Sequence, residues 1–398
     1  MRHDPGPRLF RAAARPIAGG TTNGGLPLVI AALVSAIAIY ARGQEAPPLE
    51  KAATEHLVEA RQFGWMAVAS IIDNLGKSDP KKFPGLRAFA EDYAKATRGL
   101  DPSRPPAEWP AVDVDALVTQ NPNFWRANYE IRPGDPAWMY THAGLLLACG
   151  EATRAQQILA LARQSRGTPK QMHEALDQML SVVASVIRDA NEAVGEGIKL
   201  YDKGDKDGAI GRYRDALKVW PQNSFAHYEL GLSLRAQAME ARGEVVPKLG
   251  TIQVAPQQLP KIPEVEECFA RARRHDPLRW EAYQGAGPEV LPRLVALQVG
   301  LKAWAVIMTS PAMRAPEEAL LKTSEACQLA GVHELALAGR QVVVGRRGGL
   351  GRPDHIFIST SLRALAPGPQ SEATLQYLDN PRIEMRSLID PEPENAQP

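Results

Sequence analysis

Apolar residues recur at helical spacing through most of this 398-residue chain. They return every three or four positions in Pro47–Leu75, Pro84–Thr97 and Pro169–Lys203, the spacing expected of one buried face on an α-helix. Segments with the same pattern follow at Trp138–Arg166, Leu291–Thr309, Pro316–Ala330, His333–Val344 and His355–Leu365. Proline and glycine punctuate their ends. The pattern predicts an all-α fold.

The most regular stretch is Ala193–Pro221, which reads as two short helices joined at Gly204 and closed by Pro221. A step of 34 residues carries its small residue Gly197 onto Gly231. The same step brings the flanking positions Ala193 and Leu200 onto His227 and Leu234. This register indicates a repeated helical hairpin.

In these positions the chain resembles the tetratricopeptide repeat, with Gly197, Ala209, Tyr213 and Ala216 at its small and aromatic positions and a closing proline. Two usual aromatics are replaced, by Ala193 and Leu200. The resemblance is specific over 193–287 and weaker over 138–166 and 316–344. It implies an irregular solenoid of helical hairpins, with a repeat array over 121–290.

The second repeat unit is interrupted, because its second helix is expected only at Val265. The insertion spans 237–262, and its part Gly243–Ile262 contains three prolines. A loop protruding from a hairpin tip leaves a stacked core undisturbed. A third unit starting at Trp280 is expected to be partial, since Pro288 breaks it.

The N-terminal region has the pattern of a membrane-targeting segment. Residues 1–25 are rich in arginine, and the uncharged stretch Leu26–Ala41 follows. We interpret 26–42 as a signal or transmembrane anchor, with cleavage before Gln44 or none. Either form would place residues 44–398 on the exported side of a bacterial cell envelope, anchored or secreted. A buried core helix is the alternative.

Between these landmarks the chain divides by composition. A helical region and a proline-rich connector occupy 47–112, and Asn121–Trp138 gathers aromatic and turn residues ahead of the first hairpin. C-terminal helices are expected over 291–366, with a basic glycine-rich turn at Gly345–Pro353. Residues 367–398 are expected to form a flexible tail.

Composition narrows the chemistry. The formal charge of +1 gives no global field for nucleic acid, so no nucleic-acid partner is expected. The cysteines Cys149, Cys268 and Cys327 lie far apart within apolar patterns and are interpreted as core residues. The histidines lie in no HExxH or CxxC context, and no nucleophile elbow occurs, so neither an enzyme nor a cofactor is predicted.

The function predicted is therefore that of a scaffold or adaptor that binds a protein or peptide through the repeat groove or the inserted loop. The candidate groove residues are Asn191, Ile198, Tyr201, Phe225, Tyr228 and Arg235. Packing between helices is the alternative role of the two aromatics Phe225 and Tyr228. Two other functions stay open: a secreted or anchored hydrolase whose catalytic region lies in 44–137, and a structural subunit that uses the insertion as its contact.

Overall fold

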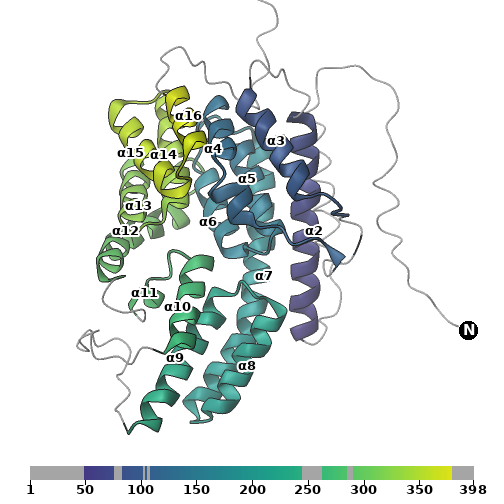
Figure 1. Ribbon diagram of the computed structural model, residues 1–398, viewed down its shortest axis with the longest axis vertical. Coiled ribbons are helices and arrows are strands. Elements are labelled where there is room, and N and C mark those ends of the chain that lie inside the picture. The colour runs from purple at the N-terminus through teal and green to yellow at the C-terminus, as the bar shows by residue number, and fades with distance from the viewer. Residues whose placement is uncertain are drawn as a thin grey trace, which may run out of the picture.

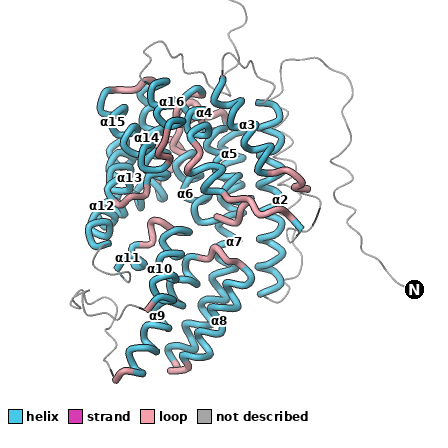
Figure 2. The backbone as a smooth tube through the Cα atoms, viewed as in Figure 1, coloured by secondary structure: helices cyan, strands magenta, loops and turns pink. Residues whose placement is uncertain are grey.

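The computed structural model describes residues 49–75, 83–101, 104, 108–243, 262–284 and 290–378. Within these ranges the chain forms helices and turns and no β-strand, which confirms the all-α class (Figure 2). The elements are α2 (Leu49–Leu75), α3 (Pro84–Ala96), the π-helical turn η2 (Asp115–Thr119), α4 (Pro122–Glu130), α5 (Pro136–Ala148), α6 (Ala152–Ala162), α7 (Lys170–Asp202), α8 (Lys206–Val219), α9 (Ser224–Ala241), α10 (Pro263–His275), α11 (Trp280–Gln284), α12 (Leu291–Thr309), α13 (Glu317–Leu329), α14 (His333–Arg347), α15 (Arg352–Leu365) and α16 (Pro369–Leu378).

Three helical hairpins, α5–α6, α7–α8 and α13–α14, turn in the same way. Each has a left-handed glycine after its first helix, at Gly150, Gly204 and Gly331. The next N–H then donates to the carbonyl five residues back, as from Asp205 to Leu200 at 3.0 Å. This bond pattern ends an α-helix without leaving its last carbonyls unpaired, and glycine alone adopts the required φ without strain. The turn predicted at Gly204 is therefore confirmed.

The helices are arranged as a larger body and a projecting arm. Figure 1 shows α13 to α16 beside α4, α5 and α6, with α8, α9 and α10 extending away at the opposite end. The long helix α7 belongs to both parts, because it packs on α2 and α6 near its start and on α8 and α9 near its end. A separate small core fills the arm and includes Val194, Ile210, Tyr213 and Leu230.

Aromatic side chains fill the core of the larger body. The ring of Phe124 stacks on Trp138 with centroids 5.1 Å apart, and Phe89 meets Phe124 edge-on at 5.3 Å. All three rings are buried. Phe89 lies on α3, whereas Phe124 and Trp138 come from the segment Asn121–Trp138, which gathers aromatic and turn residues and contains α4. Asn121 begins this helix by accepting hydrogen bonds from the N–H groups of Asn123 and Phe124, and Pro122 is tolerated at the first helical position.

The prediction of a flexible tail from residue 367 is wrong for its first part. Residues Pro369–Leu378 form α16, which packs on α4 and α15. Its side chains Leu375 and Leu378 are buried, and Thr374 donates a hydrogen bond to the Pro122 carbonyl. Apolar burial against a distant helix therefore orders a stretch whose local composition looks polar.

The glycine-rich turn is shorter than predicted. Helix α14 continues through Gly345 to Arg347 and ends at Gly348, which has a φ of 76°. Arg347 pairs with Glu317 on α13 and with Asp354 on α15. These two pairs tie the basic turn to its neighbouring helices.

Two sequence predictions fall largely on residues outside the described ranges. Helix α9 continues to Ala241, past the predicted start of the insertion at 237, and residues 244–261 are not described. Leu26–Ala41, the expected anchor, also lies outside the described residues. Among the described helices, none has the length and apolar character needed to span a bilayer.

Candidate functional site

Two neighbouring helices of the arm present a mixed apolar and polar surface, which we call the α7–α9 face. On α7 it consists of Asn191, Gly195, Ile198 and Asp202, and on α9 of Phe225, Glu229 and Leu232. Steps of three and four residues place each set on one side of its helix. None of the seven is fully buried. The face therefore offers side chains of both kinds to a ligand.

The six residues predicted as groove residues divide between this face and the arm's interior. Asn191, Ile198 and Phe225 lie on the α7–α9 face, and Tyr201 is half-buried to one side, under the Lys206 ammonium at 5.8 Å. Tyr228 and Arg235 are only 7% and 8% exposed.

These two buried residues pack on α10. The Arg235 guanidinium lies 4.5 Å from the centroid of the Phe269 ring, and the Tyr228 ring lies 6.0 Å from it. Arg235 is also 3.9 Å from Glu266. Both side chains thus serve interhelix packing in this structure, and a binding role for the six residues stays a prediction.

Glu229 is the residue on this face that the sequence prediction missed. Its pKa is raised to about 7, mainly by partial burial; the Arg279 guanidinium opposes this shift, and the carboxylates of Asp202 and Glu281 add to it. The only sequence signal was its position four residues after Phe225 within one helix. A carboxyl group with this pKa changes charge near neutral pH.

Arg279 forms one border of the face. Its guanidinium lies 4.9 Å from the Phe225 ring centroid, and its Nε donates to Ser224 Oγ at 3.1 Å. It also lies 3.4 Å from Asp276. Because Arg279 is engaged with Ser224, Asp276 and the Phe225 ring, its positive charge lowers the pKa of Glu229 only in part.

Gly195 gives the face a local depression. A Cβ added there would meet no atom within 4 Å, whereas one added at Gly197 would lie 2.4 Å from the Tyr213 ring. Gly197 is therefore small because α8 packs against it. At Gly195 no packing contact within the described chain requires a glycine. A glycine in a helix interior nevertheless costs about 1 kcal/mol relative to alanine.

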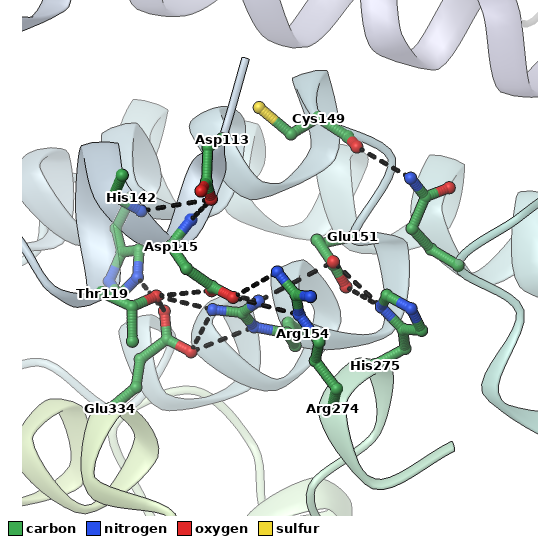
Figure 3. A network of polar contacts seen from close by, with 12 residues as sticks. Asp113, Asp115, Thr119, His142, Cys149, Glu151, Arg154, Arg274, His275 and Glu334 are labelled. Atoms are coloured by element: carbon green, nitrogen blue, oxygen red, sulfur yellow. Dashed lines mark hydrogen bonds and ion pairs between the residues drawn. The ribbon is translucent and has the colours of Figure 1, made fainter. Parts of the chain in front are cut away.

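A second cluster of titratable side chains lies buried in the larger body (Figure 3). At its centre, Arg154 on α6 makes ion pairs of 2.8 Å with Glu334 on α14 and 2.9 Å with Asp115 on η2. Arg154 also donates to Thr119 at 2.7 Å. On α5, His142 Nε2 lies 2.9 Å from the other oxygen of Glu334. The cluster joins elements separated by up to 219 residues in sequence, from Asp115 to Glu334.

The cluster continues to α10. His275 Nδ1 lies 3.0 Å from Glu151, and Arg274 reaches Asp115 at 2.8 Å. The ring of His275 stacks on His227 with centroids 5.8 Å apart. Burial is the main cause that lowers the pKa of His227 to about 4.

The charges in this cluster are paired. Burial acts to raise the pKa of Glu334, but the Arg154 guanidinium and the hydrogen bond from His142 hold it at about 2. Burial opposes the charge of Arg154, and Glu334, Glu151 and Asp115 together raise its pKa. An ionised carboxylate held by a guanidinium is a poor proton acceptor. The arrangement suits a connection between α6, α14 and η2 better than acid–base chemistry.

A cleft of about 290 Å³ opens between α6, α7 and α12. Its polar part is the ion pair of Arg163 with Asp177, at 2.7 Å, and its apolar part includes Leu180, Ile307 and Met308. This volume lies at the lower end of the range for small-molecule pockets, about 300–1,000 Å³.

The described residues give no support to metal or thiol chemistry. No group of three His, Cys, Asp or Glu residues within them has the geometry to hold a metal ion. Burial raises the pKa of Cys149 to about 12 and that of Cys268 to about 11, which disfavours a reactive thiolate.

Comparison with known proteins gives no family assignment for the chain. No family model, no curated protein and no solved structure matches it.

Proposed function

We propose that this protein is a scaffold of the tetratricopeptide type that binds a protein or peptide on the α7–α9 face. Two observations support the repeat assignment. The hairpins α5–α6, α7–α8 and α13–α14 share one turn geometry, and Gly197 and Gly231 both lie where two helices cross closely. Repeat proteins of this class bind partners along the first helices of their hairpins, which here are α7 and α9.

The observation that carries the proposal is the character of the α7–α9 face itself. Half-buried Ile198 on α7 and Phe225 on α9 share this face with Glu229, a carboxyl group already partly removed from water. Apolar side chains beside a few fixed polar groups are typical of binding surfaces. The amide oxygen of Asn191 is buried and makes no hydrogen bond within the described residues, so a ligand N–H would reach it only after the side chain turns outward.

The charges near Glu229 indicate the kind of partner. Asp202 and Glu281 add negative charge, and Arg279 is already engaged. A peptide segment that combines apolar side chains with lysine or arginine complements this face. The open space at Gly195 would admit its backbone closely.

We also propose that the scaffold lies on the exported side of a membrane, because Leu26–Ala41 has the composition of a signal or anchor segment. Labelling with a membrane-impermeant reagent at a cysteine placed on α8 would test this location. Modification in intact cells supports export, and modification only after lysis contradicts it.

The hydrolase alternative has one observation in its favour, since η2 lies within 44–137 and brings Asp115 to a cluster with His142 and Glu334. It is the weaker proposal. Arg154 neutralises these carboxylates, and acid–base chemistry needs at least one group free to exchange a proton.

A peptide selection tests the proposed function. A random peptide library displayed on phage would be panned against the purified full-length protein at pH 8. We expect enrichment of peptides with apolar residues near lysine or arginine, and elution of those phage when the pH falls to 5.5 and Glu229 is protonated. Enrichment of acidic peptides, or none above background, contradicts the proposal.

A further inference from the structure

Helix α12 exposes a stripe of valines that nothing in the described chain covers. The α12 stripe consists of Val295, Val299, Lys302 and Val306, at steps of four, three and four residues. The valines are 61%, 65% and 41% exposed, and Lys302 is exposed among them. Exposed apolar residues that lie together on a surface often mark an interaction site, whereas single scattered ones are normal.

The opposite side of α12 packs against the rest of the protein. Leu297 and Ile307 are buried, and Gly300 approaches α13 so closely that an added Cβ would lie 2.4 Å from the Ala326 Cβ. The core of the protein therefore needs only this side. The helix is apolar on its outward side as well, where a surface helix normally carries polar residues.

The charges of this chain segment all have one sign, and the first acids after it, Glu317 and Glu318, pair with Arg347 and Lys322. From Leu291 to Pro316 the chain contains Arg293, Lys302 and Arg314 and no aspartate or glutamate. Lys302 lies within the α12 stripe, so any partner covering the valines must also accommodate an ammonium group.

The turn after α12 adds an exposed methionine in a strained conformation. Met313 has a φ of 61° and is 45% exposed, and its N–H donates to the Arg163 carbonyl at 2.9 Å. Glycine or asparagine is the usual residue in this region of φ. A strained backbone that exposes an apolar side chain is more often found where that side chain binds a partner.

We propose that the α12 stripe, with Met313 and Arg314, docks on an anionic lipid surface. Headgroup phosphates would pair with Lys302 and Arg314, while the valines and Met313 would enter the boundary between headgroups and acyl chains. The proposal does not depend on peptide binding by the α7–α9 face, which belongs to the other part of the molecule (Figure 1).

Two other occupants fit the charge pattern less well. A second copy joined symmetrically through this stripe would bring Lys302 close to its own equivalent, with no acid between 291 and 316 to neutralise the pair. Residues 379–398 carry five acids and two arginines, but three of the acids, at 390, 392 and 394, lie beyond the apolar residues of this tail. Those apolar residues, Ile383, Met385, Leu388 and Ile389, lie among two arginines and one acid, so their local charge is positive like that of Lys302.

The test uses the full-length protein with a local probe. An environment-sensitive fluorophore is attached at Val299→Cys, and at Arg214→Cys on α8 as control, after replacement of the native cysteines by alanine. Vesicles of phosphatidylcholine contain either a quarter phosphatidylglycerol or none, and part of the lipid carries a shallow spin-label quencher. We expect quenching at position 299 on anionic vesicles and little at position 214.

Two variants make the result specific. Lys302→Ala should reduce binding to anionic vesicles about fivefold, as expected for one cation near a charged surface. Met313→Gly relieves the left-handed strain, so it should keep or raise stability while weakening vesicle binding.

Three outcomes would overturn the proposal. One is equal quenching at positions 299 and 214. Another is a label at 299 that is shielded without vesicles as protein concentration rises, which would identify a second copy. The third is shielding at all concentrations that disappears when residues 379–398 are deleted, which would identify the chain's own tail.

Discussion

Single side chains decide two features of this molecule, one in the larger body and one in the arm. Arg154 binds carboxylates from two distant segments, and Glu229 is a carboxyl group that the fold partly dehydrates. Substituting either side chain should change the free energy of unfolding, because a charge buried without a partner costs far more than the same charge exposed to water.

Arg154→Met should destabilise the fold by about 3–5 kcal/mol, since it leaves the buried carboxylate of Glu334 without its cation, whereas Asp115 keeps its pair with Arg274. Arg163→Met, on the same helix, is the control, because its partner Asp177 is half-exposed and such pairs contribute about 0–1 kcal/mol. Urea unfolding followed by circular dichroism measures both. Equal losses for the two variants would mean that the buried cluster does not hold the helices together.

Glu229→Gln should stabilise the protein at pH 8 and not at pH 4. The folded pKa of Glu229, about 7, is above the usual value of 4.5, so the wild type loses stability as pH rises between them. The gain at pH 8 should be on the order of 1–2 kcal/mol after allowance for partial exposure. Urea titrations across this pH range measure it, with Glu192→Gln on the solvent side of α7 as control. A gain that does not vary with pH would contradict this assignment.

Among the elements, those with strong helical periodicity and a turn glycine could be predicted from the sequence. Helix α12 has the predicted ends, and the turn at Gly204 follows from its neighbours alone. Helices α4 and α16 were missed because distant burial orders them. Asn121 and Pro122 look like a turn, and Leu375 finds its contacts only in the folded chain.

The candidate site shows the same division. Ile198 and Phe225 could be placed on a common face by counting residues along two helices. The buried state of Tyr228 and Arg235 could not, because it depends on how α10 meets α9 after the insertion. Likewise, no local pattern pairs Arg154 with Glu334, which lies 180 residues further along the chain.

At the scale of the whole molecule, α7 links a closed body to a more open arm. In the body, α14 packs on α6 and α16 on α4, so the end of the described chain returns to its beginning. No later helix of the described chain covers the arm in this way, so the α7–α9 face stays accessible to solvent. Because the α7–α9 face is accessible, we propose that the arm is the part that binds a peptide. The α12 stripe is a separate exposed surface on the body.

A matched pair of glycine variants tests whether a peptide binds on the α7–α9 face. Gly195→Leu and Gly211→Leu both replace a helix-interior glycine of one hairpin at which an added Cβ meets nothing within 4 Å. Both should raise stability by about 0.5–1 kcal/mol, because leucine is the better helix former. Only Gly195 lies on the α7–α9 face.

The measurement is the affinity of a peptide from the phage selection, by fluorescence anisotropy, for the two variants and the wild type. We expect Gly195→Leu to weaken binding by about tenfold or more, roughly 1.4 kcal/mol, and Gly211→Leu to leave it within about twofold. Equal affinities for the two variants, or a loss in both, would contradict binding on the α7–α9 face.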